Sequence, residues 1–477
     1  MIAPLILIPL AGALVAWLIP TEELRPRLLA ICTTIHLGLT LYLLPSLKQL
    51  PADRWITLDP IGMLVLVSIS LLFCAAAWYS TGYLAYRRER SNRMYCSGIL
   101  VSLSAATLAT ATHHLGILWI AVEATTLTMA PLIYFNRNSR SVEATWKYLL
   151  ICSIGVALAL LGLFFLAYAT MVAGMPPTLH LDDFFTTQQH LSPTWLHAAF
   201  AFLLVGFGTK AGLAPLHTWK PDAYGEAPGM VGALLAGALA NCAFLGLLRV
   251  YQVSMATAEI EFLKQALIAI GLLSMGVAAV FMARQADIKR LLAYSSVEHI
   301  GIMALGLGIG GKALFGCLLH LMGNSLTKGV LFLTSGNIHR SYNSKSTHQI
   351  RGVLKRLPWT GGLFLAGYFA ITGTPPFSPF VSIFAIINGA FAEQQYLAAS
   401  LMLVFLAAIF IGLASIILPV VMGTEREDGD ATPYRDSLAT VGPSLVLVLL
   451  LIMLGLWIPE PVNDLLRDGV RLLEVHR

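Results

Sequence analysis

The sequence predicts an all-α polytopic membrane protein with about fourteen transmembrane helices, two inverted five-helix repeats and two broken helices. Three observations carry this prediction: an apolar composition, the recurrence of apolar runs of about 20 residues, and prolines inside two of those runs. Hydrophobic residues make up 57% of the 477 residues and charged residues only 12%. A soluble domain of this composition would have too little polar surface to cover it, which excludes a soluble fold.

Charge and cysteine content narrow the class further. The net charge of +5 would suggest nucleic acid in a soluble protein, but in a membrane protein it indicates basic cytoplasmic loops, so the lipid bilayer and not nucleic acid is the expected partner. The six cysteines are scattered through apolar runs without a CxxC spacing, which argues against a metal site or a disulfide framework. We expect them to be small core residues.

Apolar runs long enough to cross a bilayer recur along the whole chain. The N-terminal run lacks the basic start of a signal peptide, so we predict a retained first helix there. The predicted spans are 2–19, 26–46, 60–79, 95–112, 114–134, 146–170, 195–218, 228–250, 262–283, 290–310, 312–337, 359–391, 396–422 and 437–458.

The basic residues between the spans predict the orientation. Nineteen Lys and Arg residues, Lys220 among them, fall in loops after odd-numbered spans, and six fall in loops after even-numbered spans or in the tail. Because cytoplasmic loops are enriched in Lys and Arg, both termini are predicted to face away from the cytoplasm. We expect a three-helix N-terminal segment over 1–94, repeats over 95–250 and 251–422, and a C-terminal helix and tail over 423–477.

Ionisable residues inside the spans are the candidate functional residues. A lysine at the membrane centre costs about 2.5–3.5 kcal/mol, so a functional role is the default hypothesis for Lys210 and Lys328. Glu123 is also in mid-span. Arg249 and Lys264 lie at span ends, where we expect their charged heads to extend to the interface.

Spans six, ten and eleven add further candidates. Lys147 follows Glu143 by four residues, which suits a surface ion pair as well as a functional role. The remaining candidates are Glu298 and His299 in span ten, and His320, Asn324 and Lys328 in span eleven. The spacing of four places the last three on one helical face. Such a series indicates a proton relay, although hydrogen bonds that only join helices are the alternative.

Prolines predict where two helices break. Pro215 lies inside span seven, and the segment ITGTPPFSPF, which covers 371–380, lies inside span twelve. Proline removes backbone hydrogen bonds, and broken helices at membrane depth are tolerated where they line a cavity. A matching pair of breaks in two halves of the chain indicates an inverted repeat with ion sites near the breaks.

Three segments carry a resemblance to a known family. KAGLAPLHTWKPDAYGEAP, ADIKRLLAYSSVEHIG and HLMGNSLTKGVLFLTSGNI resemble signature segments of the antiporter-like, proton-translocating subunits of respiratory complex I and related membrane-bound hydrogenases. Within that superfamily, GVLKRLPWTGGLFLAGYFAITGTPPFSPF and EAPGMVGALLAGALANCAFLGLLR most resemble the F-type membrane subunit of hydrogenase-4-like group 4 nickel–iron hydrogenases. The resemblance covers roughly residues 60 to 420.

The resemblance implies roles for particular residues. It places the family's buried glutamate at Glu123 and its span-seven lysine at Lys210, and its polar stripe of span eleven at His320 and Lys328. His217, Lys220, Asp222 and Glu226 continue the motif toward the cytoplasmic end, as an entry or as a subunit contact.

Two positions depart from the family pattern. Asn241 stands where several complex I subunits have a lysine, and it cannot hold a proton as a base. Ile383 stands where the family usually has a charged residue in broken span twelve. The departures leave three outcomes open: a truncated proton path, an exit through Glu298 or Lys328, or a subunit kept for coupling and structure.

Three functional hypotheses follow. The first is a proton-translocating subunit of a redox-driven complex in a prokaryotic inner membrane, with further antiporter-like subunits, a quinone-site or anchor subunit and a peripheral redox arm as partners. The second is a subunit of a non-redox machine, either a multisubunit sodium/proton antiporter or an inorganic-carbon uptake complex, and the third is an inert scaffold. The chain has no Rossmann glycines, P-loop, haem or iron–sulfur ligand spacing, so we expect no cofactor, no metal and no catalytic centre of its own.

Overall fold

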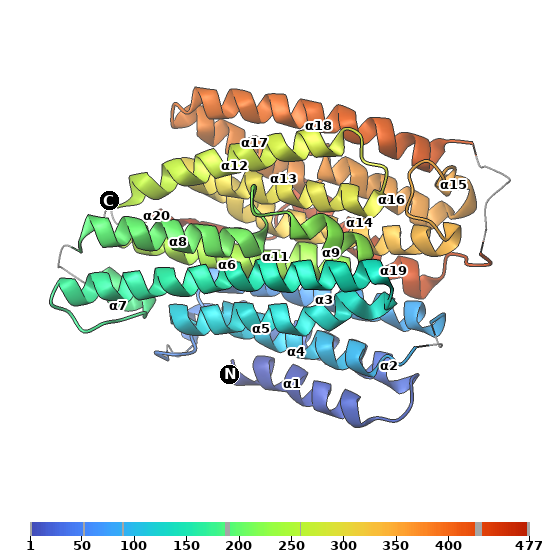
Figure 1. Ribbon diagram of the computed structural model, residues 1–477, viewed down its shortest axis with the longest axis horizontal. Coiled ribbons are helices and arrows are strands. Elements are labelled where there is room, and N and C mark those ends of the chain that lie inside the picture. The colour runs from blue at the N-terminus through green and yellow to red at the C-terminus, as the bar shows by residue number, and fades with distance from the viewer. Residues whose placement is uncertain are drawn as a thin grey trace.

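The computed structural model describes residues 2–50, 53–87, 90–186, 191–257, 259–424 and 432–474. All regular structure in these residues is helical, apart from isolated β-bridges between His114 and His180 and between Asp287 and Ser346. The long helices run side by side along the longest axis of the molecule (Figure 1). The predicted all-α class is confirmed.

The helices follow one another along the chain with short connections. In the first half they are α1 Ala3–Leu18, α2 Leu24–Leu43, η1 Leu47–Gln49, α3 Pro60–Ala85, α4 Arg93–Thr110, α5 Leu115–Ile133, η2 Tyr134–Asn136, α6 Ser139–Val172, α7 Leu181–Thr186, α8 Pro193–Ala211, α9 Trp219–Glu226, α10 Gly229–Ala233, η3 Leu234–Leu239 and α11 Ala240–Ala256. In the second half they are α12 Ile260–Met282, α13 Ile288–Ile309, α14 Ala313–Tyr342, α15 Val353–Arg356, α16 Pro358–Ile371, α17 Ser378–Ala392, α18 Tyr396–Met422, α19 Leu438–Leu456 and α20 Glu460–Glu474.

Nine helices in the described part of the chain are long and apolar enough to cross a membrane. They are 24–43, 60–85, 115–136, 139–172, 229–256, 260–282, 288–309, 396–422 and 438–456. The other five predicted spans coincide with α1, α4, α8, α14 and the α16–α17 pair, which are shorter, more polar or interrupted. The chain is therefore a multi-pass membrane protein, and the count of fourteen stays a prediction.

Both predicted helix breaks are present. α8 ends at Ala211 and α9 begins at Trp219, and Gly212 between them has a φ of +82°, a left-handed conformation that suits glycine. The amide of Gly212 donates to the carbonyl of Gly208 (2.7 Å) and so closes the last turn of α8. The second break separates α16 from α17 between Ile371 and Ser378. The first break begins at buried residues, 211–214, whereas Pro375 and Pro376 in the second break are exposed.

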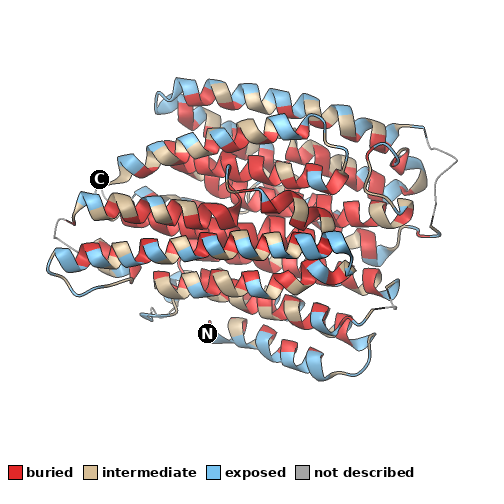
Figure 2. Cartoon of the chain, in the orientation of Figure 1, coloured by how far each residue is buried: buried red, intermediate tan, exposed pale blue. Residues whose placement is uncertain are grey.

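Burial divides the helices into an inner and an outer set. Figure 2 shows buried residues concentrated along the middle of the bundle. In their apolar stretches, the helix over 229–256 has 100% of its residues buried and α13 has 94%, whereas α12 and α18 have 33% and 28%. Outer helices thus present apolar faces to lipid, and polar side chains of the inner helices are kept away from it. All six cysteines are free and buried, as predicted.

The two ends of the bundle differ. The marked chain ends and α20 lie toward the left end in Figure 1, and α15 lies at the right end. We call these the α20 end and the α15 end. α20 packs against α3, α11 and α14 through Leu465, Leu466 and Leu473, and Asp468 on it pairs with Lys48 (2.8 Å). The predicted C-terminal tail is therefore a helix that covers the α20 end.

The prediction that Arg249 extends to the interface is wrong. Its side chain is 1% exposed and binds the carboxylate of Asp59 with two nitrogens, Nη1 to Oδ2 (2.5 Å) and Nη2 to Oδ1 (2.8 Å). Asp59 also caps α3 by accepting the amide of Gly62 (2.7 Å). Burial alone would raise the pKa of Asp59, but the guanidinium of Arg249 holds it well below its usual range. The pair joins α11 to the start of α3.

Replacing Arg249 with methionine is expected to lower the free energy of unfolding by about 3–5 kcal/mol, because it leaves a buried carboxylate without its partner. The midpoint of thermal unfolding in detergent at pH 7 measures this loss. At that pH the pair contributes fully, since a carboxyl with a lowered pKa loses its contribution only as pH falls through the acidic range. Lys264→Met is the control, because Lys264 is paired with the exposed Glu261 (3.7 Å) and not with a buried acid. Equal midpoints for the two variants would contradict the prediction.

Candidate functional site

Most of the predicted site residues lie on four inner or neighbouring helices. Glu123 is on α5, Lys210 is in the last turn of α8, Glu298 and His299 are on α13, and His320, Asn324 and Lys328 are on α14. The other predicted residues lie elsewhere: Lys147 on α6, His217 between α8 and α9, Asp222 on α9 and Asn241 on α11. Lys210, Glu298, His299, His320, Asn324 and Lys328 are each at most 3% exposed, whereas Glu123 is half-buried. A series of buried ionisable groups in an apolar bundle is the hallmark of a polar pathway.

A threonine hydroxyl joins Glu123 to Lys210. The Oγ1 of Thr126 donates to Oε2 of Glu123 (3.0 Å) and accepts from Nζ of Lys210 (2.7 Å). Lys210 also donates to the hydroxyl of Tyr148 (2.9 Å), and Ser153 donates to Oε1 of Glu123 (2.8 Å). The acid and the lysine therefore meet through a group that donates and accepts at once, not through a direct ion pair.

The lateral surroundings of Glu123 are apolar. Ile120 and Leu127, which precede and follow it on α5, are 55% and 59% exposed. A half-buried carboxylate between exposed aliphatic side chains is unfavourable next to lipid. This surface of α5 therefore suits a protein neighbour better than acyl chains.

The second group of site residues forms a chain of hydrogen bonds across three helices. Nδ1 of His299 and Nε2 of His320 are 2.8 Å apart, and Nδ1 of His320 is 2.8 Å from Oγ of Ser382 on α17. Glu298 approaches Nε2 of His299 at 4.0 Å. A neutral imidazole donates at one nitrogen and accepts at the other, so successive imidazoles and a hydroxyl can pass a proton along the chain.

The predicted stripe on span eleven divides between two neighbours. His320 contacts α13 and α17, whereas Lys328, two turns later, donates to Oγ of Ser295 on α13 (2.6 Å). Asn324 lies between them and neither its amide nitrogen nor its amide oxygen has a hydrogen-bond partner among the described residues. The three side chains share a face, as predicted, but make separate contacts.

The two positions that depart from the family pattern have clear structural surroundings. Asn241 donates through Nδ2 to Oγ of Ser325 (2.8 Å) and to the carbonyl of Leu321 (3.2 Å), so it holds α11 against α14. Ile383 is 7% exposed and belongs to an apolar cluster with Ile302 and Ile386. The polar chain instead ends at Ser382, one residue earlier.

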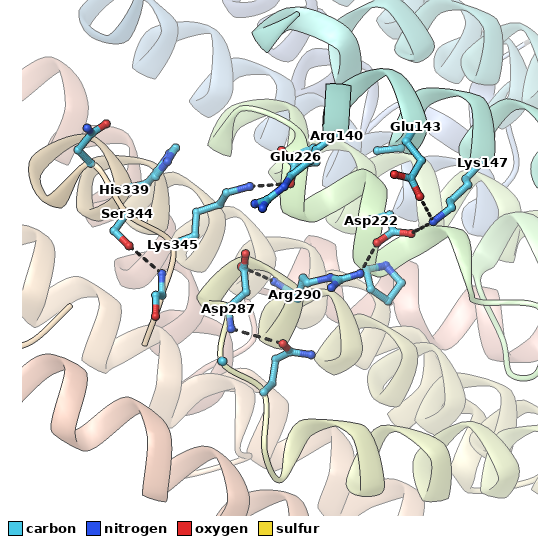
Figure 3. A pocket seen from close by; sticks show the side chains of 16 residues that line it. Arg140, Glu143, Lys147, Asp222, Glu226, Asp287, Arg290, His339, Ser344 and Lys345 are labelled. Atoms are coloured by element: carbon cyan, nitrogen blue, oxygen red, sulfur yellow. Dashed lines mark hydrogen bonds and ion pairs between the residues drawn. The ribbon is translucent and has the colours of Figure 1, made fainter. Parts of the chain in front are cut away.

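A charged pocket lies at the α15 end. It has a volume of about 750 Å³, and its lining comes from α6, α9, α13 and the end of α14. Figure 3 shows the carboxylate of Asp222 between Lys147 and Arg290, with which it forms ion pairs. Lys147 also pairs with Glu143 (2.6 Å), as its spacing predicts, and Lys345 pairs with Glu226 (2.8 Å). Lys147 and Asp222 therefore belong to this pocket and not to the interior.

The assignment of Lys220 to a loop between spans is wrong. Lys220 is fully buried, at the start of α9, and its Nζ has no hydrogen-bond partner among the described residues. His217, three residues earlier, is also buried, and its ring faces Tyr294 at 6.1 Å between centroids. The charge count places Lys220 in the loop after span seven, and here the chain turns inward instead.

Several of these contacts have no clear signal in the sequence. Thr126 follows Glu123 by three residues and so shares its helical face, which is the one hint that spacing offers. Tyr148, Ser295 and Ser382 are ordinary hydroxyl residues in apolar runs, and only the packing of the helices brings them to the site. Within the described residues, no group of three His, Cys, Asp or Glu side chains lies close enough to hold a metal ion.

The bundle with broken helices and buried ionisable groups defines an antiporter-like membrane subunit. Residues 112–412 match the family model described as NADH:quinone oxidoreductase/Mrp antiporter, TM, and the chain belongs to this family. It is 31% identical to the hydrogenase-4 component F homolog of Methylacidiphilum infernorum (isolate V4), with 97% of each chain covered.

Two solved structures share the fold. One is a chain of the membrane-bound sulfane sulfur reductase, an archaeal respiratory membrane complex, with a TM-score of 0.88, 22% identity, and coverage of 99% of this chain and 97% of that chain. The other is a chain of the Mrp complex from Dietzia sp. DQ12-45-1b, with a TM-score of 0.87, 20% identity, and coverage of 99% and 98%. At these identities the likeness establishes a common fold.

Proposed function

We propose that this chain translocates protons as a membrane subunit of a redox-driven multisubunit complex. The observation that carries the proposal is the hydroxyl bridge from Glu123 through Thr126 to Lys210. A carboxylate and an amine that share one hydroxyl can exchange a proton without either group leaving its site.

In this proposal the first half of the chain receives the proton. The charged pocket around Asp222 concentrates protons at the α15 end, and Lys210 holds the proton inside the bundle. Glu123 modulates Lys210, because an ionised carboxylate nearby favours the ammonium and a neutral carboxyl does not. His217 is buried in the break between α8 and α9, where it serves the same path.

The second half carries the proton onward. Lys328 and Glu298 are its ionisable groups on α14 and α13, and the chain of His299, His320 and Ser382 leads to broken helix α17. Ser382 then provides the polar step at the position next to Ile383, where the family pattern has a charge. An apolar site such as that of Ile383 tends to stay dry, so we place the exit on the Ser382 side.

The proposed partner subunits are inferred from the relatives of the chain. By analogy with the hydrogenase-4 relative and the respiratory complex that share its family or fold, the partners are further antiporter-like subunits, a quinone-site or anchor subunit and a peripheral redox arm. We place a neighbouring membrane subunit against the α5 surface around Glu123, where aliphatic side chains flank a half-buried carboxylate. Residues 95–250 and 251–422 are the proposed inverted repeats.

A second candidate is a subunit of a non-redox antiporter. The Mrp complex, which shares the fold with a TM-score of 0.87, favours it. A third is a coupling subunit that pumps little, which Ile383 favours together with the structural contacts of Asn241. The higher sequence identity with the hydrogenase-4 relative ranks the redox-driven complex first.

Lys210→Met is expected to leave the complex assembled and to lower its rate of proton translocation by roughly tenfold or more, because the side chain keeps its length but cannot bind a proton. Membrane vesicles that contain the complex, with a fluorescent pH probe, give the rate. Undiminished translocation by a fully assembled variant would refute the proposed function.

Thr126→Val is expected to slow translocation by roughly tenfold, since it keeps the volume and removes one hydrogen bond to each charged group. Thr125→Val is the matched control, because the Thr125 hydroxyl binds only the carbonyl of Val122 on its own helix (2.6 Å). Thr126→Ser should restore the rate. If the Thr125 and Thr126 valine variants behave alike, the hydroxyl bridge has no role in transfer.

The termini are proposed to face away from the cytoplasm, in the inner membrane of a prokaryote. A reporter fused to the C-terminus, after α20, is then active only if it is a type that works in the periplasm. The paired fusion, a reporter that works only in the cytoplasm, is expected to be inactive there. The reverse pattern would mean an error of one span in the predicted topology.

A further inference from the structure

Lys220 is a buried cation that the pathway described above does not use. It is the second residue of α9, it is fully buried, and its Nζ has no hydrogen-bond partner among the described residues. Nζ lies over the ring of Tyr224, 5.8 Å from its centroid, which is a favourable contact for a cation. An ammonium has three donors, so an apolar site without an acceptor tolerates the neutral amine far better than the charged form.

The site around Lys220 is rigid. Nε1 of Trp219 donates to the carbonyl of Thr209 (3.0 Å), which fixes the start of α9 against the last turn of α8. The hydroxyl of Tyr224 donates to the carbonyl of Leu235 (3.1 Å) and so fixes the ring that faces Nζ. The Lys220 side chain crosses Gly212, where a Cβ atom would lie 2.0 Å from Cε and 2.7 Å from Nζ. A side chain at position 212 would therefore displace Lys220 from its present place.

Lys220 lies between the two halves of the pathway. α9 packs against α6 of the first half and against α13 of the second half. The Trp219 ring, next to Lys220 in the chain, lies 5.1 Å from the ring of Tyr148, the partner of Lys210, between centroids. The Tyr224 ring, which faces Nζ of Lys220, lies 5.7 Å from the ring of Phe332 on α14, one turn after Lys328.

α11 has no amine or imidazole at the position of Asn241, which faces α14 and is held by Ser325 and the Leu321 carbonyl. An amide side chain does not take up a proton near neutral pH, so Asn241 cannot carry a proton from Lys210 to Lys328. Lys220 lies on α9, which packs against helices of both halves.

We propose that Lys220 is the proton carrier that links the two halves, in place of the basic residue that Asn241 cannot supply. This inference rests on the proposed function. The Lys210 ammonium gives up a proton to the neutral Lys220 amine through intervening water, and Lys220 then gives it to Lys328. Each step leaves one ammonium and one amine, so charge and protons balance throughout.

The test measures proton translocation by the assembled complex with Lys220→Met and Lys220→Arg. A carrier must release its proton, so both variants are expected to be slower by roughly 10- to 100-fold. Arginine keeps the cation and its contact with Tyr224 but does not deprotonate, so it separates a carrier from a structural cation. If the methionine variant fails to assemble, the arginine variant alone decides. Lys264→Met, a lysine on the outer helix α12, is the control and keeps the wild-type rate.

A second experiment moves the lysine amine from α9 to α11. Adding Asn241→Lys to Lys220→Met places a lysine on α11 and is expected to restore translocation to within about threefold of wild type. The inference is overturned if either single variant translocates at the wild-type rate, or if the double variant stays as slow as Lys220→Met. Lys210→Met is measured in parallel to separate the two proposals. If it blocks proton translocation while the Lys220 variants translocate normally, the proposed function stands and Lys220 is not part of the pathway.

Discussion

A charged side chain placed in the middle of a bilayer costs about 2.5–3.5 kcal/mol, and an unpaired backbone polar group there also costs several kcal/mol. The arrangement of this bundle follows from that constraint. Outer helices such as α12 and α18 present apolar faces, while α13 and α14 carry the ionisable residues inside them. The two mid-span lysines each have a hydroxyl partner, Thr126 for Lys210 and Ser295 for Lys328. A hydroxyl satisfies the donor without fixing the lysine in its charged form, as a carboxylate partner would.

The same constraint explains which features the sequence predicts. Apolar runs, prolines inside them and charges in mid-span are visible in the chain because lipid permits few exceptions, and the helices, both breaks and the burial of Lys210 and Lys328 agree with them. The contacts between helices are not visible in this way. Asp59 and Arg249 are 190 residues apart, and only the packing of α3 against α11 pairs them. Ser295 and Ser382 carry no signal because hydroxyl residues are common in membrane helices.

The charge pattern assigns Lys220 to a loop, and this error has a specific physical reason. A charged residue in a polar, proline-containing segment is ordinarily in a loop, and the charge count assumes so. At this break the chain re-enters the bundle, because Gly212 adopts a left-handed turn and Trp219 anchors α9 to the end of α8. Burial of the lysine is thus a property of the turn geometry, which composition and hydropathy do not contain.

The break also gives its two lysines different electrostatic environments. Lys210 lies in the last turn of α8, where the partial negative charge of the helix end favours an ammonium by about 0.3–1 kcal/mol. Lys220 lies in the first turn of α9, where the partial positive charge disfavours an ammonium to a similar extent. Lys210 also has two oxygen partners, whereas Lys220 has no hydrogen-bond partner among the residues that the structure describes and faces the ring of Tyr224. One lysine is therefore suited to hold a proton at rest and the other to carry it briefly. A continuous helix could not produce this difference between two residues so close together, and that is a physical reason for a pathway of this kind to run through a broken helix.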